Sequence, residues 1–208
     1  MFSGRERHAV GEAIAAGRDA GIEALVAAVD ARDSYTGEHS RCVVMLSTLV
    51  ARELGMTARE IEQVEQVALL HDVGKVGIPD EILLKPAPLD EDEMEVVRDH
   101  AGLGARIVGS IAGLAHLAPA IRSGHEHWDG GGYPDGLSGE EIPLPSRITA
   151  VCDAYDAMTS RRPYRRPLSR HAALAELRRH TGTQFCPLAA NALLNVLTRA
   201  REAVGAGC

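Results

Sequence analysis

The sequence is poor in aromatic residues and has no long apolar run. Only 3% of its 208 residues are Phe, Trp or Tyr, although 45% are hydrophobic. The core must therefore consist mainly of Leu, Val, Ile and Ala, and such a composition with helical spacing of the apolar residues is typical of an all-α protein. No apolar run reaches the roughly 20 residues that a membrane-spanning helix needs, so we expect no membrane span.

Cysteine is scarce as well, and its placement bears on the cellular compartment. The four cysteines show no Cys-x-x-Cys spacing, and no apolar secretory leader precedes them. Cys42 and Cys152 fall within helical apolar patterns, where a free cysteine acts as a small core residue. We therefore expect a reducing, cytoplasmic location.

Positive charge is also in deficit, which argues against nucleic acid as a partner. The formal net charge is −7, so the surface as a whole does not attract DNA, RNA or an acidic membrane. Basic residues do gather in one short segment, at Arg161, Arg162, Arg165 and Arg166. A local anion, such as a phosphate group, could still bind there.

The pattern of apolar residues and helix breakers predicts a single compact helical bundle of about seven or eight helices. Residues 1–18 are polar and interrupted by glycine, and we expect a lead-in or linker followed by one domain over 19–208. Pro79, Pro86 and Pro88 predict a loop over residues 74–89. Helices are expected over 20–31, 36–54, 57–71, 90–100, 100–110, 114–126, 146–159, 169–180 and 187–200.

One stretch combines adjacent histidine and aspartate with the end of an apolar helical pattern. His71 continues the helical stripe of Val64 and Ala68, so its imidazole should face the interior, and Asp72 follows directly. This pair can give one nitrogen and one carboxylate to a metal ion, or share the carboxylate between two ions. The alternative is a buried histidine that only makes a helix-capping hydrogen bond.

Further candidate ligands lie on other predicted helices. In the predicted helix 114–126, Leu117, Ile121 and His125 would share one row, so His125 would also face the core. Asp153 and Asp156, three residues apart, would form a separate acidic edge, for which a solvated surface is the alternative. With His100, these sites offer one ligand each from different helices, as in bundle metal centres. Mixed His and Asp ligands suit Fe, Mn, Zn, Co or Ni better than Mg or Ca.

An ordered set of motifs runs along the chain: His71–Asp80, Lys85-Pro86, His100 with Gly104, His125–Pro134, Cys152–Ser160 and Arg162–Arg165. This set resembles the HD-GYP domain, a bacterial branch of the HD metal-dependent phosphohydrolases, over roughly residues 22–197. The resemblance implies an all-helical HD-type fold, a centre of two or three metals, and hydrolysis of cyclic di-GMP to the linear dinucleotide pGpG, to GMP, or to both.

Three positions depart from the pattern of this family. Gly124 stands where the family has a second metal-binding histidine before His125, so one ion would lack a protein ligand. Tyr35 stands where three-metal members carry a glutamate, which favours two metals and makes His39 the weakest ligand candidate. Ala101 replaces a common proline after the histidine.

The resemblance assigns a role to each candidate residue. Two divalent ions, Fe or Mn by preference, would be bridged by Asp72. His71 and Asp153 would complete one coordination shell, and His100 and His125 the other. Bound metals lower the pKa of water and polarise phosphoryl oxygens. Lys75, Arg162 and Arg165 would hold the phosphates of the substrate, and the loop Gly130–Pro134 would pack beside the site, where it could also dock a partner domain. A homodimer is compatible with the sequence.

Three functions remain open from the sequence. The first is a working cyclic di-GMP phosphodiesterase. The second is a degenerate domain, weakened at Gly124, that binds the nucleotide or a protein but turns over poorly. The third is an HD-type phosphohydrolase that acts on another nucleotide. Metal content per chain, measured together with turnover of cyclic di-GMP in the presence of Mn or Fe without oxygen, separates them.

Overall fold

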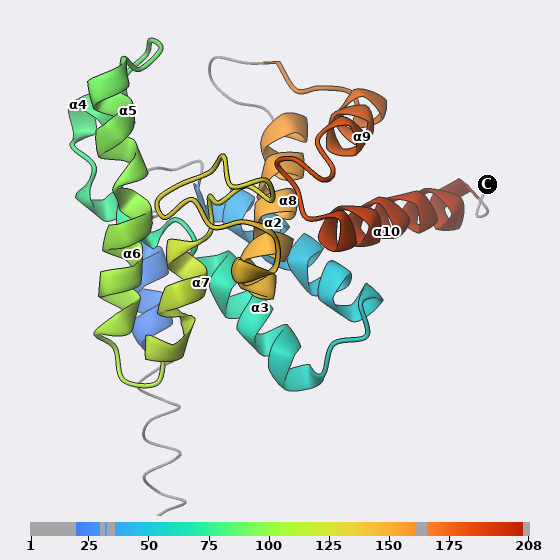
Figure 1. Cartoon of the computed structure of the whole chain (residues 1–208), viewed down its shortest axis with the longest axis horizontal. Coiled ribbons are helices and arrows are strands. Elements are labelled where there is room, and N and C mark those ends of the chain that lie inside the picture. Colours follow the sequence, from blue (N-terminus) through green and yellow to red (C-terminus); the bar gives the residue numbers. More distant parts are fainter. Residues whose placement is uncertain (1–19, 30–31, 33–35, 161–165, 206–208) are drawn as a thin grey trace, which may run out of the picture.

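Helices make up the regular structure of this protein. The computed structural model describes residues 20–29, 32, 36–160 and 166–205, and these contain two isolated bridges but no β-strand. Residues 20–29 are helical. The labelled α-helices are α2 (Thr36–Glu53), α3 (Ala58–Leu70), α4 (Asp80–Leu83), α5 (Glu91–Arg98), α6 (His100–Gly109), α7 (Ala118–Arg122), α8 (Leu144–Thr159), α9 (Arg170–Arg179) and α10 (Pro187–Gly205) (Figure 1). Three short 3₁₀ helices are η1 (Val73–Gly77), η2 (Ala115–Leu117) and η3 (Gly139–Glu141). The predicted all-α class is confirmed.

Local sequence signals set several of these helix ends. Thr57 caps α3 in a reciprocal arrangement with Glu60, whose carboxylate accepts from the Thr57 backbone N–H at 2.8 Å. Asp90 and Glu93 repeat this capping box at the start of α5. Gly55, with φ of 71°, occupies the left-handed region just beyond α2, where glycine has no steric penalty.

Two predictions of local structure were wrong. The segment 74–89 is not all loop, because η1 and α4 lie within it; Pro79 occupies the N-cap of α4, where its missing N–H costs nothing. The expected helix 114–126 is a 3₁₀ turn followed by the short α7, which ends at Arg122. Gly124 and His125 therefore lie in a turn, and the predicted helical row through His125 is not formed.

Tertiary pairing explains the early end of α7. After α7, the backbone of residues 128 and 129 forms hydrogen bonds with a turn that is distant in the sequence. Trp128 N–H donates to Gln184 O at 3.1 Å, and Asp129 N–H donates to Thr183 O at 2.9 Å. The N–H of Tyr133 donates back to His125 O at 3.2 Å. These bonds hold residues 125–133 as a loop, which a local apolar pattern could not reveal.

Helix α3 joins two hydrophobic clusters. Val64 and Ala68 belong to the larger cluster, together with buried residues of α2, α8, α9 and α10. Val67 and Leu70 belong to the second cluster, together with the helix of residues 20–29, α6, η2 and α7. Because α3 is covered on both faces, its C-terminal end, which carries His71 and Asp72, lies where the two clusters meet.

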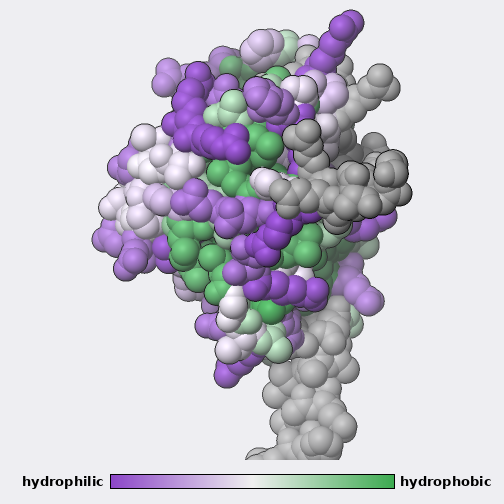
Figure 2. Space-filling model, turned by 90° about the vertical axis from the view of Figure 1, so that its right-hand side faces the viewer, coloured by the Kyte–Doolittle hydropathy of each residue, from purple (hydrophilic) through white to green (hydrophobic). Residues whose placement is uncertain are grey.

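The surface mixes polar and apolar residues. Figure 2 shows one face on which hydrophobic residues lie between hydrophilic ones. Exposed apolar side chains include Met45 of α2 and Leu188 of α10. Within the described residues, none of the helices is both long and apolar enough to cross a membrane.

The packing of α10 predicts a stability difference between two leucines of this helix. Leu193 is 0% exposed in the larger cluster, whereas Leu188 is 52% exposed. Leu193→Ala should lower the free energy of unfolding by about 2–5 kcal/mol, because it opens a cavity in the core. Leu188→Ala is the matched control and should change the free energy of unfolding, measured by urea denaturation, by less than about 0.5 kcal/mol. Equal losses would show that α10 does not pack as described.

Candidate metal centre

His71 presents one ring nitrogen to the site and uses the other to fix its orientation. At the C-terminal end of α3, its Nδ1–H donates to the carbonyl oxygen of Ala68 at 2.7 Å. In the neutral ring Nε2 carries the lone pair; this buried atom has no hydrogen-bond partner among the described residues and lies 3.3 Å from Asp72 Oδ2. Burial would lower the pKa of His71, but the charge of Asp72 raises it in the metal-free site. A metal ion is the partner that such an atom lacks.

Asp72 is a buried carboxylate surrounded by nitrogen atoms. It is 5% exposed, and its Oδ2 accepts a hydrogen bond from Lys75 Nζ at 2.6 Å, while Oδ1 has no hydrogen-bond partner. Burial alone would raise the pKa of Asp72, but the charges of His71 and Lys75 outweigh burial and hold the pKa well below its usual range. The group is thus a carboxylate at neutral pH, with one oxygen available for a cation.

Asp72 belongs to two groups of possible metal ligands. In the first, ligand atoms of His39, His71 and Asp72 lie within 4.8 Å of one another. In the second, the same holds for Asp72, His100 and His125. The buried, unpartnered His71 Nε2 and Asp72 Oδ1 show that these residues fit a metal centre, and the shared carboxylate fits a centre with two ions.

His100 and His125 face each other across the second group. The Nδ1–H of His100 donates to Val97 O at 2.5 Å, so its Nε2 carries a lone pair, and that atom lies 2.9 Å from His125 Nε2. Two nitrogens that bind one ion at about 2.0–2.1 Å each lie roughly 3 Å apart when at right angles. Burial lowers the pKa of His100, and burial with the charge of His100 lowers that of His125 to about 4, so both are neutral and able to bind a metal at pH 7.

His39 is held between two carboxylates of α8. Its Nδ1 lies 2.6 Å from Asp156 Oδ2 and its Nε2 lies 3.2 Å from Asp153 Oδ1. The solvated alternative for the acidic edge of Asp153 and Asp156 is wrong, because Asp156 is only 5% exposed and both aspartates contact His39. Among the described residues, Asp153 is in neither ligand group; it contacts His39 instead. Asp156 was missed as a site residue, because its contact spans 117 positions of sequence.

The glycine-rich loop packs against His125. The rings of Tyr133 and His125 are stacked, with centroids 5.1 Å apart and planes 7° from parallel. Gly132 lies so close to the chain that a Cβ there would meet the backbone N of His127 at 2.2 Å. Arg122 of α7 donates two hydrogen bonds of 2.6 Å to Asp135, which ties the far side of the loop to α7. The loop thus lies beside the site, as the resemblance implied.

A cavity lies beside His125. Its volume is about 250 Å³, and it is lined by residues that include Gly124, His125, Glu126, Tyr133 and Asp153. Gly124 is buried and places no side chain in this space. The missing histidine is thus replaced by open volume. Arg162 and Arg165, the expected phosphate contacts, lie outside the described residues.

Comparison with known proteins agrees with this geometry. The family model of the HD domain matches residues 23–187. The chain is 40% identical over 183 residues to the cyclic di-GMP phosphodiesterase response regulator RpfG of Xanthomonas campestris, covering 83% of this chain and 46% of that protein. It is 40% identical over 177 residues to a cyclic di-GMP phosphodiesterase of Thermotoga maritima, covering 84% and 48%.

Two solved structures are also similar. A Vibrio cholerae cyclic GMP-AMP phosphodiesterase, V-cGAP3, has a TM-score of 0.54 at 32% identity, covering 85% of this chain and 40% of that one. Bd1817, an HDG"Y"P protein of Bdellovibrio bacteriovorus, has a TM-score of 0.64 at 18% identity, covering 90% and 64%. The chain spans less than half the length of the two curated relatives named above.

The contacts of His39 predict a pH dependence of stability for the metal-free protein. Burial would lower the pKa of His39, but hydrogen bonds and charges from Asp153 and Asp156 raise it from 6.5 to about 9. Because the folded pKa lies above the unfolded one, the stabilisation is complete below pH about 6.5 and is lost as the pH rises through about 9. The free energy of unfolding should be higher for the wild type than for His39→Gln below pH about 6.5. This difference should become smaller as the pH rises through about 9. A difference that is constant with pH would contradict the pairing.

Proposed function

The chain belongs to the HD domain family, as the resemblance to its HD-GYP branch predicted, and from that premise we propose that it is a metal-dependent phosphodiesterase that hydrolyses cyclic di-GMP. The observation that carries this proposal is the buried Asp72 carboxylate, which two groups of histidines share. The names of the 40%-identical relatives support the choice of substrate. The products would be pGpG, GMP or both, and the location would be cytoplasmic.

The residues divide into two ligand sets around two divalent ions. His39, His71 and Asp72 would hold one ion, with Asp153 beside His39, and Asp72, His100 and His125 would hold the other. We infer Fe or Mn, with Zn, Co or Ni as other candidates for mixed His and Asp ligands. When bound, the ions would lower the pKa of a water molecule and neutralise charge on the phosphoryl oxygens.

The protein side chains then orient the ligands and the substrate. Ala68 O and Val97 O fix the rings of His71 and His100 through their Nδ1–H groups. Asp156 does the same for His39. Lys75, whose side chain is 29% exposed, reaches both Asp72 and solvent, so it can hold Asp72 in place and donate a hydrogen bond to a phosphate oxygen of the substrate. Arg162 and Arg165 would supply further charge for the phosphates.

Two alternatives have specific support. The cavity at Gly124 favours a weakly active domain, because one ion would have fewer protein ligands. The second alternative is a different cyclic dinucleotide: a relative in Vibrio cholerae that is 38% identical is named a 3'3'-cGAMP-specific phosphodiesterase.

We also propose that the loop Gly130–Pro134 docks a partner domain and that a homodimer can form. Assays of cyclic di-GMP and 3'3'-cGAMP side by side, without oxygen and with Mn or Fe, test the substrate.

Asp72→Ala should remove both metal binding and hydrolysis, because one carboxylate serves both ligand sets. Asp72→Asn, which keeps the shape, should lose at least one ion. Asp92→Ala is the matched control, since Asp92 is an exposed aspartate in the first turn of α5. The measurement is metal content per chain with phosphodiesterase rate. Two ions retained by Asp72→Ala would refute the bridging role.

Restoring a histidine at position 124 should strengthen the weaker ion site. Gly124 has no positive φ, and a Cβ there would meet Ile121 O at 3.3 Å, so a side chain fits after a small shift. Gly124 and His125 line the same cavity, which gives an imidazole at position 124 room to reach the same ion. Gly124→His should shift the metal dependence of the rate to lower concentration, whereas the control Gly124→Ala should not. The curves are measured after chelation and reconstitution. Superimposed curves for all three proteins would mean that the missing imidazole does not limit activity.

A further inference from the structure

We propose that Arg32 is a positioning residue, which holds the backbone that follows Asp72 and thereby holds Lys75 against Asp72. The residue follows the helix of residues 20–29 and belongs to none of the motifs that the sequence pattern singled out. Its role deepens the proposed function, on which the activity part of the test below rests.

The Arg32 guanidinium binds three backbone carbonyl groups of one turn. Its two NH groups donate to Val76 O at 2.5 Å and to Ile78 O at 2.7 Å, with a longer bond to Lys75 O at 3.3 Å. The same group pairs with the side chain of Asp80, at the start of α4. Only a fork of several donors can reach so many acceptors at once, which is a property of arginine rather than lysine.

The acceptors explain why the turn needs this cation. The 3₁₀ helix η1 covers Val73–Gly77, and Lys75 O already accepts the Ile78 N–H at 3.1 Å. Val76 O and Ile78 O lie at the end of this turn, where a helix leaves carbonyl groups without a partner further along the chain. The carbonyl groups of Lys75, Val76 and Ile78 point at one place, where their dipoles would repel one another without a positive charge. Arg32, with a side chain that is 29% exposed, supplies that charge from a partly shielded position.

The turn that Arg32 holds carries Lys75. The N–H of Lys75 donates to Asp72 O at 2.9 Å and its Nζ donates to Asp72 Oδ2 at 2.6 Å, so backbone and side chain both bind Asp72. Val29, Arg32, Lys75 and Val76 also line one small cavity. A change in the position of Arg32 is therefore transmitted through one turn to Lys75 and to its contact with Asp72.

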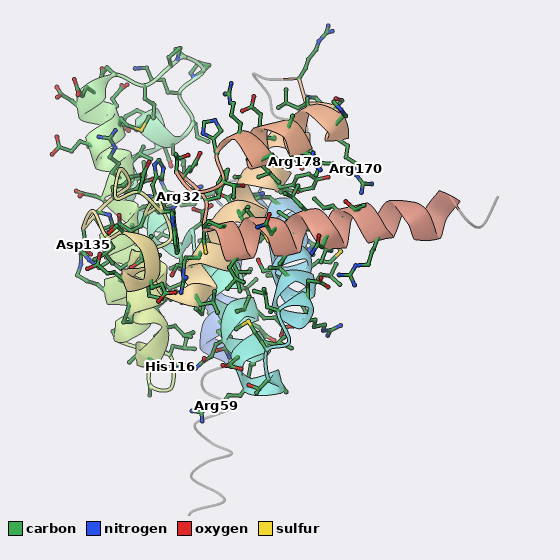
Figure 3. All side chains as sticks on the ribbon, turned by 45° about the vertical axis from the view of Figure 1, so that its right-hand side comes forward. Arg32, Arg59, His116, Asp135, Arg170 and Arg178 are labelled. Atoms are coloured by element: carbon green, nitrogen blue, oxygen red, sulfur yellow. The ribbon has the colours of Figure 1, made fainter. Side chains whose placement is uncertain are left out.

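Arg32 follows the helix of residues 20–29, and this helix packs in the hydrophobic core. Its buried Ile22 and Val29 pack in the second hydrophobic cluster with Val73, which is the first residue of η1. Figure 3 shows Arg32 near the middle of the molecule, whereas Arg59 of α3 lies at its periphery. Arg59 is exposed and therefore serves as the matched control for an arginine-to-alanine change.

The first experiment measures the turn without relying on activity. Hydrogen exchange of the Lys75 and Ile78 amides, which bond to Asp72 O and Lys75 O in η1, should become faster in Arg32→Ala, while exchange in α8 stays at its wild-type rate. Arg59→Ala should change neither. Unchanged exchange over residues 73–80 in Arg32→Ala would overturn the proposal, whether or not the protein proves to be a phosphodiesterase.

The second experiment asks whether Arg32 acts through Lys75. Arg32→Ala should lower kcat about 10- to 100-fold with metal content unchanged, since small misplacements of a catalytic group have effects of this size. In a Lys75→Ala background the same change should cost little, because the two residues work as one unit. Additive losses in the double variant would overturn the proposal. Absence of any phosphodiesterase activity in the wild type would refute the proposed function instead, and the exchange result would then decide the role of Arg32.

Rescue separates positioning from loss of folding. Guanidinium ion, at concentrations far below those that unfold the protein, should restore part of the kcat of Arg32→Ala, and Arg32→Lys should keep an intermediate kcat. A variant that is merely destabilised would be harmed by guanidinium, so a further loss of rate would contradict the proposal. If Arg32→Ala does not fold, Arg32→Lys is compared with Arg59→Lys by exchange, and equal protection of residues 73–80 in these two variants would also overturn it.

Discussion

The structure depends on one buried negative charge, the carboxylate of Asp72. An ion with 5% exposure is costly to remove from water unless opposite charges and hydrogen bonds surround it. Lys75 satisfies one oxygen at 2.6 Å, and the second oxygen is left for a cation between the histidines. This arrangement makes Asp72 the single residue on which both ligand groups and the adjoining 3₁₀ turn depend.

Two imidazole rings near Asp72 are oriented by the same type of hydrogen bond to the backbone. His71 and His100 each donate Nδ1–H to the carbonyl oxygen three residues earlier, which directs Nε2 of each ring to the site. Helix α3 is clamped between two hydrophobic clusters, so the end that carries His71 is fixed on both sides. The ends of packed helices thus position His71, Asp72 and His100, whereas His125 comes from a longer loop, where the stacked ring of Tyr133 supports it.

The sequence predicted the parts of the site that follow local patterns. The apolar stripe of α3 indicated that His71 faces inward, and capping residues located the ends of α3 and α5. Contacts between residues that are far apart in the chain could not be predicted from the sequence. The burial of Asp156 depends on His39, 117 positions away, and the end of α7 depends on hydrogen bonds from residues 128 and 129 to the turn at 183 and 184. The role of Arg32 could not be predicted for the same reason, because its acceptors are backbone carbonyl groups that have no sequence signature.

The claim that two ions share Asp72 is tested most directly by electron paramagnetic resonance of the protein titrated with Mn²⁺. If one carboxylate bridges both sites, two ions per chain should bind and couple magnetically, so that the signal of isolated Mn²⁺ disappears as the second ion enters. The coupling should be absent in Asp72→Asn. A spectrum of isolated Mn²⁺ that simply doubles on adding the second equivalent would contradict a shared carboxylate and, with it, the proposed two-ion centre.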